Sequence, residues 1–429
     1  MSAISMVTAV NKHPKIFYGW YILTIGMLGS LVAVGFSQLF MSVMLKPLTA
    51  EFGWSRTAAT GAITAGTILS GLFSLPFGKL ADRYGPRMLT AAGALITAVM
   101  YFFMTKFFTL WEYYAIFLIG RVISTNAISN IVPRTAVVNW FRRLRGRALG
   151  LLAMATPLGA SGIAIAAQLI MEQHGWRSVF LLFAMGAIFL QVLPAALILR
   201  RRPEDCGLLP DGDQALESAP SDQRTGHEEF SWTLREAVQT PALWLLIVSS
   251  IISLIVNAGV GFHLVAYYTD VGIPATVAVG ALSIYAFTGA MASVVWGFLS
   301  ERISERLLAS AVMFLTAGAI LYLQTVTAAP GAIVFAAFFG FTSRGEGTLV
   351  NIILAQYYGR NSYGSIGGFV NPFNMIGLGA GPLISSVMFD NMGSYEMIFS
   401  VFIALSIVSA ILLWLAKKPA LPARTHAPV

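Results

Sequence analysis

The chain contains about twelve separate stretches of roughly 20 apolar residues, and no other feature restricts its possible folds so severely. Such a stretch crosses the hydrocarbon core of a bilayer as an α-helix, because a helix satisfies its own backbone hydrogen bonds where no water is available. Hydrophobic residues make up 57% of the 429 positions and charged residues only 11%, which is typical of membrane proteins. We expect an all-α protein with about twelve transmembrane helices, embedded in a lipid bilayer.

A polar segment near the middle of the chain divides the apolar stretches into two sets of six. We expect residues 1–199 to form one six-helix bundle and residues 241–429 a second. Residues 200–240 are expected to be a cytoplasmic linker, with a short surface helix near 230–237.

The two halves align with each other without gaps around their second apolar stretches, at an offset of 219 residues. Gly78 aligns with Gly297, and Asp82 aligns with Glu301. Parallel repeats of this kind are a transporter architecture, with the substrate site near the bilayer midplane between the halves. The sequence therefore predicts two pseudo-symmetric bundles.

The basic residues are distributed unevenly between alternate loops. About 20 of the 27 Lys and Arg residues fall on one side of the predicted membrane, and four fall on the other. An excess of Lys and Arg marks the cytoplasmic side, so we expect both termini there and the protein in a cell membrane (inner or plasma). The net charge of +8 then reflects topology and does not indicate nucleic-acid binding. The first residues lack the pattern of a cleaved signal peptide, and the first span is expected to direct insertion.

Catalytic and metal-binding patterns do not emerge from the sequence. Cys206 is the single cysteine, and no cluster of Cys, His, Asp and Glu has the spacing of a metal site. The phosphate-cradling motif of ATP-driven proteins and the nucleophile elbow of hydrolases are both missing. We expect neither an enzyme nor a cofactor, and we expect the protein to function as a monomer.

The segment from Gly78 to Arg87, which reads Gly-Lys-Leu-Ala-Asp-Arg-Tyr-Gly-Pro-Arg, resembles the signature of the major facilitator superfamily. A degenerate copy lies at residues 297–306. The resemblance implies the major facilitator fold and a gate on the inner side, formed by an ion pair between helices. The alternative is that these charges only anchor the loops at the lipid headgroups. The candidate gating residues are Asp82, Arg83, Arg87, Glu301 and Arg302, with Arg134 as a partner for Asp82.

Shorter segments resemble the branch that holds oxalate/formate antiporters and monocarboxylate transporters. They include residues 17–20, 51–56 and 139–148. In that branch an arginine commonly lies in the eighth span, at the position of Ser293, so this chain departs from the carboxylate-binding pattern. Hinge residues are expected in the fifth and eleventh spans, where glycine and proline permit close crossings and weaken the helix. These are Pro157, Gly159, Gly381 and Pro382.

Four charged residues remain inside the predicted spans after the loops are assigned: Arg121, Arg134, Arg344 and Glu346. An arginine at mid-bilayer costs roughly 3 kcal/mol, so such residues usually face a cavity and bind something. Arg344 is followed by Thr348 and Asn351 on the same helix face.

Guanidinium, hydroxyl and amide donors together suit a carboxylate, so we interpret the stripe Arg344, Thr348 and Asn351 as an anion clamp. The alternative is a salt bridge between Arg344 and Glu346, although a spacing of two places them on different faces. Arg121 is either a substrate or coupling residue, or a hydrogen-bonding hub.

Ion coupling is the second hypothesis for the residues inside the spans. Glu346 can carry a proton, pair with another helix or contact substrate, and the imidazole of His263 is a second candidate for proton coupling. Packing or interhelical hydrogen bonding is as reasonable for His263. Further polar residues are candidates for lining the substrate site: Asn257, Tyr267, Asn371 and Asn374.

The leading hypothesis is therefore a secondary transporter that moves a small organic anion by alternating access, with proton symport as the first choice. Anion exchange and efflux of amphipathic compounds are the alternatives within the transporter class. A non-transporting membrane receptor would belong to a different class and would usually need a large signalling domain, for which this chain leaves no room.

Overall fold

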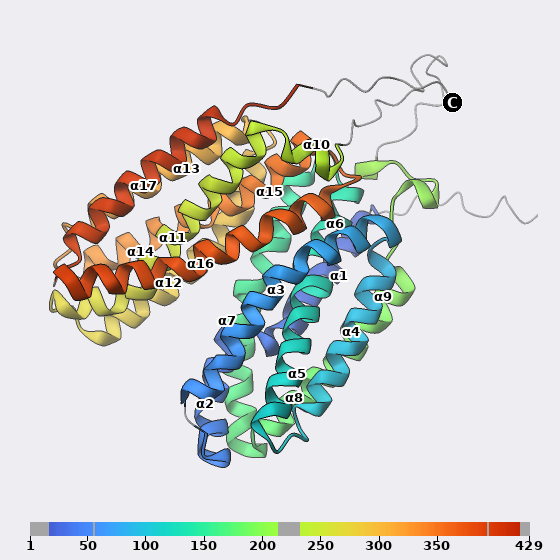
Figure 1. Ribbon diagram of the computed structural model, residues 1–429, viewed down its shortest axis with the longest axis horizontal. Coiled ribbons are helices and arrows are strands. Elements are labelled where there is room, and N and C mark those ends of the chain that lie inside the picture. The colour runs from blue at the N-terminus through green and yellow to red at the C-terminus, as the bar shows by residue number, and fades with distance from the viewer. Residues whose placement is uncertain (1–16, 55, 213–231, 393, 421–429) are drawn as a thin grey trace, which may run out of the picture.

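The computed structural model describes residues 17–54, 56–212, 232–392 and 394–420, and within these ranges it contains helices and no strands. The helices form two bundles (Figure 1). The first bundle consists of α1 (Gly19–Val32), η1 (Ala33–Phe36), α2 (Gln38–Phe52), α3 (Arg56–Tyr84), α4 (Pro86–Phe103), α5 (Leu110–Ile123), η2 (Ser124–Ser129), α6 (Ile131–Trp140), α7 (Arg145–His174), α8 (Trp176–Gly186), η3 (Ala187–Val192) and α9 (Leu193–Ile198).

The second bundle follows a short connecting region. It consists of α11 (Pro241–Asp270), α12 (Ala275–Leu299), α13 (Glu305–Leu323), α14 (Ala329–Ser343), α15 (Gly345–Tyr358), α16 (Tyr363–Met392) and α17 (Glu396–Leu415). The connection contains the short elements η4 (Glu204–Cys206), η5 (Pro210–Gly212) and α10 (Leu234–Val238). The surface helix expected near 230–237 corresponds to α10, which begins with a capping box between Thr233 and Glu236.

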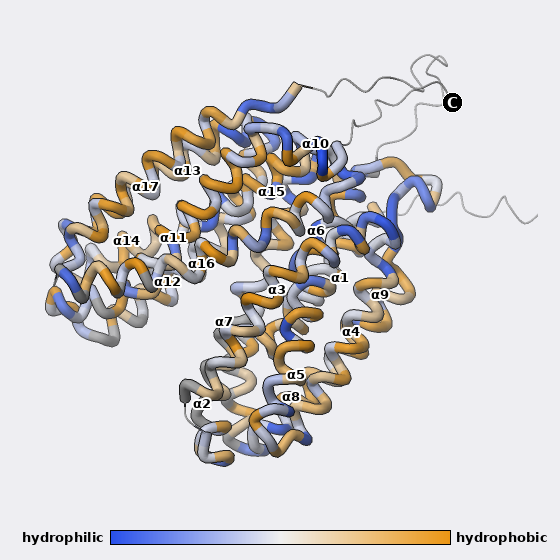
Figure 2. Tube along the Cα trace, viewed as in Figure 1, coloured by the Kyte–Doolittle hydropathy of each residue, from blue (hydrophilic) through white to orange (hydrophobic). Residues whose placement is uncertain are grey.

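Ten helical segments of the described ranges have the length and apolar composition to cross a membrane. The 30-residue α7, and α14 continued by α15, supply two more long segments, which together make the twelve that the sequence predicts. Apolar residues cover most of each helix, and hydrophilic residues gather at the helix ends and beside the connecting region (Figure 2). We call the end next to that region the inner end and the opposite end the outer end, following the orientation expected from the basic residues.

Several spans are interrupted near mid-membrane, whereas the two spans with the expected hinge prolines are not. The first span changes to a 3₁₀ turn at η1, and the fourth and sixth contain π-helical turns at η2 and η3. The tenth span breaks at Arg344, between α14 and α15. By contrast, α7 continues as one helix past Pro157, and α16 continues past Pro382. Interruptions of this kind free backbone groups and often mark functional sites.

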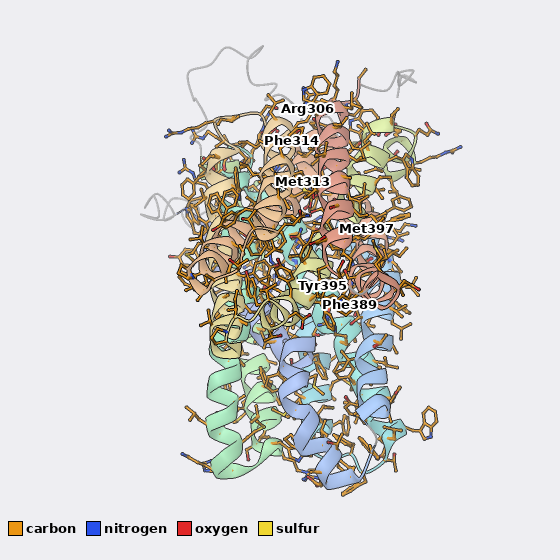
Figure 3. The ribbon with its side chains drawn as sticks, turned by 90° about the vertical axis from the view of Figure 1, so that its left-hand side faces the viewer. Arg306, Met313, Phe314, Phe389, Tyr395 and Met397 are labelled. Atoms are coloured by element: carbon orange, nitrogen blue, oxygen red, sulfur yellow. The ribbon has the colours of Figure 1, made fainter. Side chains whose placement is uncertain are left out.

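The two bundles share a core on the inner side and have separate cores on the outer side. One cluster of buried apolar residues combines first-bundle residues such as Trp140 with second-bundle residues such as Tyr358. The other two clusters each draw on one bundle alone. The bundles accordingly diverge toward their outer ends (Figure 1). In a view turned by 90°, Arg306 lies toward the inner end of the second bundle, and Phe389 and Tyr395 lie toward its outer end (Figure 3).

Candidate functional site

Asp82, near the inner end of α3, binds the beginning of a helix in the opposite bundle. Its carboxylate accepts hydrogen bonds from the backbone N–H of Gly364 at 3.0 Å and of Ser365 at 2.7 Å. It also accepts one from the Ser365 hydroxyl at 2.6 Å. These residues form the first turn of α16, where unpaired N–H groups and the helix dipole favour a negative charge. Asp82 therefore joins the two bundles at the inner end by capping a helix.

Glu301, which the sequence aligns with Asp82, makes the reciprocal contact. It lies just after α12, and its carboxylate accepts hydrogen bonds from the Arg147 backbone N–H at 3.2 Å and from Arg147 Nε at 2.6 Å. Arg147 belongs to the first turn of α7 in the first bundle. Each bundle thus places an acid on the N-terminus of a helix in the other, as the repeat predicts.

Two pairs of glycines allow the backbones of the bundles to touch beside these acids. A methyl group on Gly78 would collide with the carbonyl oxygen of Gly364, and one on Gly297 would collide with that of Gly146. A side chain larger than hydrogen would hold the helices apart at either crossing. The glycines therefore permit the close contact between the bundles beside the two acids.

Two arginines also bind the opposite bundle, each at the C-terminus of a helix. Arg145 is only 2% exposed, and it donates from Nε to the Phe141 carbonyl at 3.0 Å and from Nη1 to the Ala355 carbonyl of α15 at 3.1 Å. Arg360 donates to the Asn139 carbonyl of α6 at 3.2 Å. Carbonyl groups at a helix C-terminus favour a cation. From the sequence, both arginines were explained by membrane orientation alone. Their position at helix ends in the structure is what distinguishes them from the other basic residues of the loops.

The expected ion pair between Asp82 and Arg134 is not formed. Arg134 instead donates from Nη1 to the Asn351 side-chain oxygen at 3.3 Å, across the two bundles. Asn351 therefore belongs to the inner contact and not to an anion clamp. A helix N-terminus offers Asp82 several aligned donors, which makes an arginine partner unnecessary.

The other candidate gating residues make local contacts. Arg83 lies over the ring of Tyr84, 5.2 Å from its centroid. Arg87 donates to the Ala196 carbonyl at 2.9 Å, within the first bundle. For Arg302 the structure shows a backbone hydrogen bond to the Leu299 carbonyl.

Arg344 lies at the break between α14 and α15, with an exposed side chain. Its Cγ packs against Gly289 of α12. The guanidinium forms no hydrogen bond or ion pair with the residues that the structure describes. Gly347 and Asn351 follow on the same face, and Asn351 contacts the first bundle through Arg134. Arg344 is therefore an available cation on the side of the second bundle that faces the first.

The carbonyl groups released by this break are bound by neighbouring helices. Asn257 of α11 donates to the Ser343 carbonyl at 3.2 Å, and Trp296 of α12 donates to the Phe341 carbonyl at 2.8 Å. The Thr348 hydroxyl donates to the Arg344 carbonyl at 3.1 Å. Thr348 therefore supports the break and does not offer its hydroxyl proton to a ligand in this arrangement.

Glu346 lies two residues beyond Arg344 and turns to the opposite side. It is 2% exposed, and its carboxylate accepts a hydrogen bond from the Ser250 hydroxyl of α11 at 3.0 Å. No ion pair joins Glu346 to another of the described residues. The alternative of a salt bridge between Arg344 and Glu346 is therefore not realised.

Arg121 satisfies a backbone group at another interruption. Its Nη1 donates to the Phe36 carbonyl in η1 at 3.1 Å, and its Nε is buried without a partner in the described ranges. The side chain also packs against Gly66 of α3. This geometry agrees with the hydrogen-bonding hub, the second of the two roles expected for Arg121.

His263 and Tyr267 contact the outer part of the second bundle. His263 lies 3.3 Å from the Tyr395 hydroxyl through Nδ1 and 3.3 Å from the Pro382 carbonyl through Nε2. The Tyr267 hydroxyl donates to the Leu323 carbonyl at 3.1 Å. Both side chains thus connect helices within one bundle.

The remaining polar and hinge candidates lie in contacts between helices. Asn371 is buried, and the side-chain oxygen of Asn374 is buried without a partner in the described ranges. Gly159 packs closely on Leu31 of α1, and Gly381 packs on the Ile255 carbonyl of α11.

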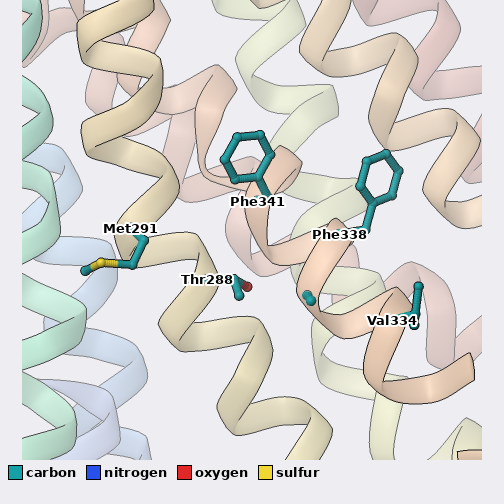
Figure 4. Close-up of a pocket in the computed structure, with 6 residues that line it drawn as sticks. Thr288, Met291, Val334, Phe338 and Phe341 are labelled. Atoms are coloured by element: carbon teal, nitrogen blue, oxygen red, sulfur yellow. The ribbon is translucent and has the colours of Figure 1, made fainter. Parts of the chain in front are cut away.

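A hollow of about 510 Å³ lies elsewhere, between α12 and α14 (Figure 4). Its lining is almost entirely apolar and includes Met291, Phe338 and Phe341. It contains none of the charged residues described above, so we place the candidate site at Arg344 and not at this hollow.

Two helical bundles that meet at one end, with interrupted spans and charged residues at the interruptions, define the class of polytopic membrane transporters. The family model of the Major Facilitator Superfamily matches residues 26–380 and also 267–428. The chain belongs to the Major Facilitator Superfamily.

Curated relatives and solved structures agree with this assignment. Monocarboxylate transporter 4 of Rattus norvegicus is 25% identical over 419 residues, which cover 95% of this chain and 84% of the relative. Monocarboxylate transporter 3 of Gallus gallus is 24% identical over 94% of this chain and 79% of the relative. The human organic anion transporter MFSD10 (TETRAN) has a TM-score of 0.68 and 15% identity, covering 94% of this chain and all of that chain. The E. coli fucose:proton symporter FucP has a TM-score of 0.71 and 13% identity over the same shares. The two solved structures support the fold alone.

Proposed function

We propose that this chain is a secondary transporter that moves a small organic anion of the carboxylate type by alternating access, together with a proton. One observation carries the proposal. Arg344 is an exposed cation near mid-membrane, has no partner among the described residues, and lies on the side that faces the opposite bundle. A charge in that position is costly unless it binds something.

The chemistry of Arg344 favours a carboxylate. A guanidinium presents paired donors that match the two oxygens of a carboxylate, and the pair is strong where water is scarce. The relatives named monocarboxylate transporters support the same substrate class. Ser293, where their branch commonly carries an arginine, is buried and donates to the Gly289 carbonyl at 3.2 Å. The Arg344 side chain packs on Gly289, which lies one helical turn before Ser293 in α12.

The inner contacts support alternating access. They involve four helix termini, and all close the same side while the bundles diverge on the other (Figure 1). Opening them and closing the outer side would expose Arg344 to the interior. Glu346 is the first choice for the coupled proton, because an ionised carboxylate in its buried place would lack a counter-charge. His263 is the second choice.

The test begins with a thermal-shift screen of purified protein against mono- and dicarboxylates, since a binder stabilises the state that it binds. Flux of the best binder is then measured in proteoliposomes for wild type, Arg344→Ala, Arg344→Lys and Arg121→Ala. We expect Arg344→Ala to reduce kcat/KM by roughly 100-fold or more, because a charge-assisted bidentate contact contributes about 3 kcal/mol. Arg344→Lys should retain part of the flux. Unimpaired flux in both alanine variants would refute the anion clamp.

Coupling is tested in the same vesicles. A proton symporter accumulates the anion when the outside is acidified and moves protons with it. Glu346→Gln should abolish the response to a pH gradient, whereas His263→Gln should retain it. Flux that ignores the gradient but rises with anion inside the vesicle would indicate exchange and refute symport.

A further inference from the structure

The buried surroundings of Glu346 gather oxygen atoms from three segments of the second bundle. Ser250 and Ser253 of α11 are 4% and 1% exposed, and both hydroxyls face the carboxylate of Glu346. Asn257 follows on the same face of α11 and lies beside Ser253. The Ser343 carbonyl, released at the end of α14, completes the group.

Asn257 is incompletely satisfied in this group. Its Nδ2 donates to Ser253 Oγ and to the Ser343 carbonyl, both at 3.2 Å. Its Oδ1 is buried with no donor among the described residues. A half-turn of the side-chain amide exchanges the positions of Nδ2 and Oδ1. Oδ1 would then face the Ser253 and Ser343 oxygens, and a cation among these three oxygens would stabilise that arrangement.

The turned amide produces a set of five oxygen donors: one carboxylate, two hydroxyls, one amide and one backbone carbonyl. Hard cations prefer such donors, and interrupted helices in transporters bind Na⁺ or protons through freed carbonyls. The charge also fits. One carboxylate neutralises one Na⁺, whereas a divalent ion would leave a buried positive charge without a partner.

We propose that Glu346, Ser250, Ser253, Asn257 and the Ser343 carbonyl form a Na⁺ site, and that Na⁺ competes there with a proton on Glu346. The proposal deepens the proposed function by naming an ion and its ligands. It rests on that function only for coupling, because Na⁺ binding is measurable without any substrate.

The position of the group explains how an ion would affect the substrate. Ser343 and Glu346 lie on either side of Arg344 in the chain, so ligands to one ion would fix the joint between α14 and α15. The Arg344 guanidinium would then be held in one direction. A bound Na⁺ would raise the affinity for the anion, and by linkage the anion would raise the affinity for Na⁺.

The competition with protons depends on Glu346 alone among the groups that the structure brings together here. The face of α11 contributes Ser250, Ser253 and Asn257, none of which titrates near neutral pH. On its own side of the break, the nearest charged residue is Arg344, which turns to the other face. Protonation of a ligand weakens cation binding, so the apparent Kd for Na⁺ should rise up to about tenfold for each unit of falling pH.

The experiment measures the melting temperature of the full-length protein against NaCl, with choline chloride holding the ionic strength constant, at pH 6, 7 and 8. We expect a saturable increase with Na⁺ and a smaller or absent one with K⁺, and we expect more Na⁺ to be needed as the pH falls. Glu346→Gln should remove the response. Asn257→Ala should raise the apparent Kd for Na⁺ by roughly tenfold or more.

Asn126→Ala is the matched control. Asn126 also has a buried Oδ1 with no partner in the described part of the chain, but it lies in the first bundle, where its Nδ2 donates to the Ser70 carbonyl. It should leave the Na⁺ response unchanged. If a variant does not fold, ²²Na⁺ binding to wild type and to Ser253→Ala decides, with a loss of affinity expected in Ser253→Ala. Equal stabilisation by choline, or a full response in Asn257→Ala and Glu346→Gln, would overturn the site. Organic-anion binding without Na⁺ binding would refute the site alone, and the reverse would refute the proposed substrate alone.

Discussion

Removing the ion pair between Arg147 and Glu301 should shift the protein from outward-open toward inward-open, because this pair joins the bundles only on the inner side. The Arg147 Nε to Glu301 oxygen distance is 2.6 Å, and the side chains are 38% and 11% exposed. A hydrogen bond to a charged group contributes roughly 1.5–3 kcal/mol, and a fully exposed pair contributes about 0–1 kcal/mol. Partial exposure places this pair between them, at about 1–2 kcal/mol, or roughly 5–30-fold in the ratio of the two states.

The assay is a double-mutant cycle of Arg147→Gln, Glu301→Gln and both together, in a Cys206→Ser background. Spin labels are attached at Trp111→Cys and Met397→Cys, two exposed positions toward the outer ends of the first and second bundles. Distance distributions between the labels give the populations, with shorter distances when the outer side closes. The coupling energy is the part of the shift that the two single variants do not explain.

The pair between Arg177 and Glu51 provides a control within the same chain. Its shortest distance is also 2.6 Å, with side chains 39% and 40% exposed, but both residues belong to the first bundle. Arg177→Gln should leave the label distances unchanged. An equal shift in this control, or a coupling energy within about 0.3 kcal/mol of zero at Arg147 and Glu301, would refute the reasoning.

Three further substitutions test the inner contacts, the first two with the same labels and the third by its melting temperature. Asp82→Asn keeps an acceptor for α16 but loses the charge, so the outward-open state should lose about 1 kcal/mol, and an unchanged population would contradict helix capping. Gly78→Ala places a methyl group against the Gly364 carbonyl, so the outer-end distances should become mostly short; mostly long distances would mean that the helices yield at this crossing. Arg145→Met leaves buried carbonyl groups without their donor and should destabilise the protein by about 2–4 kcal/mol, measured as a lower melting temperature; an unchanged melting temperature would show that water replaces the guanidinium.

Apolar length was sufficient to predict the helical segments, because the bilayer enforces helices. The resemblance of residues 78–87 to the superfamily signature indicated the family. The offset of 219 residues also indicated that Asp82 and Glu301 correspond, and the structure gives them corresponding contacts. The partner of Asp82 could not be predicted from the sequence. It consists of backbone N–H groups at a helix N-terminus, and every residue type except proline has such a group. Arg344, Thr348 and Asn351 were predicted to form one anion clamp. In the structure the Thr348 hydroxyl donates to the Arg344 carbonyl, and the Asn351 side-chain oxygen accepts a hydrogen bond from Arg134. Because Thr348 and Asn351 bind other groups of the protein, only Arg344 of these three remains available to a ligand among the described residues.

The charged side chains at the inner end bind helix ends of the opposite bundle, and this limits the free energy of each contact. Asp82 and Glu301 bind helix N-termini of the opposite bundle, which carry about half a positive charge. Arg145 and Arg360 bind helix C-termini, which carry about half a negative charge. A contact with half a charge contributes about 1 kcal/mol, so several together hold one state without trapping it. Fully buried ion pairs would cost several kcal/mol to break and would demand more energy than a small ligand supplies. Reversing a 99:1 preference needs about 5.5 kcal/mol of differential binding, which an anion on Arg344 together with a cation on Glu346 is of the right size to supply. The summed free energy of the weak inner contacts is therefore similar in magnitude to the binding energy that ligands on Arg344 and Glu346 would supply.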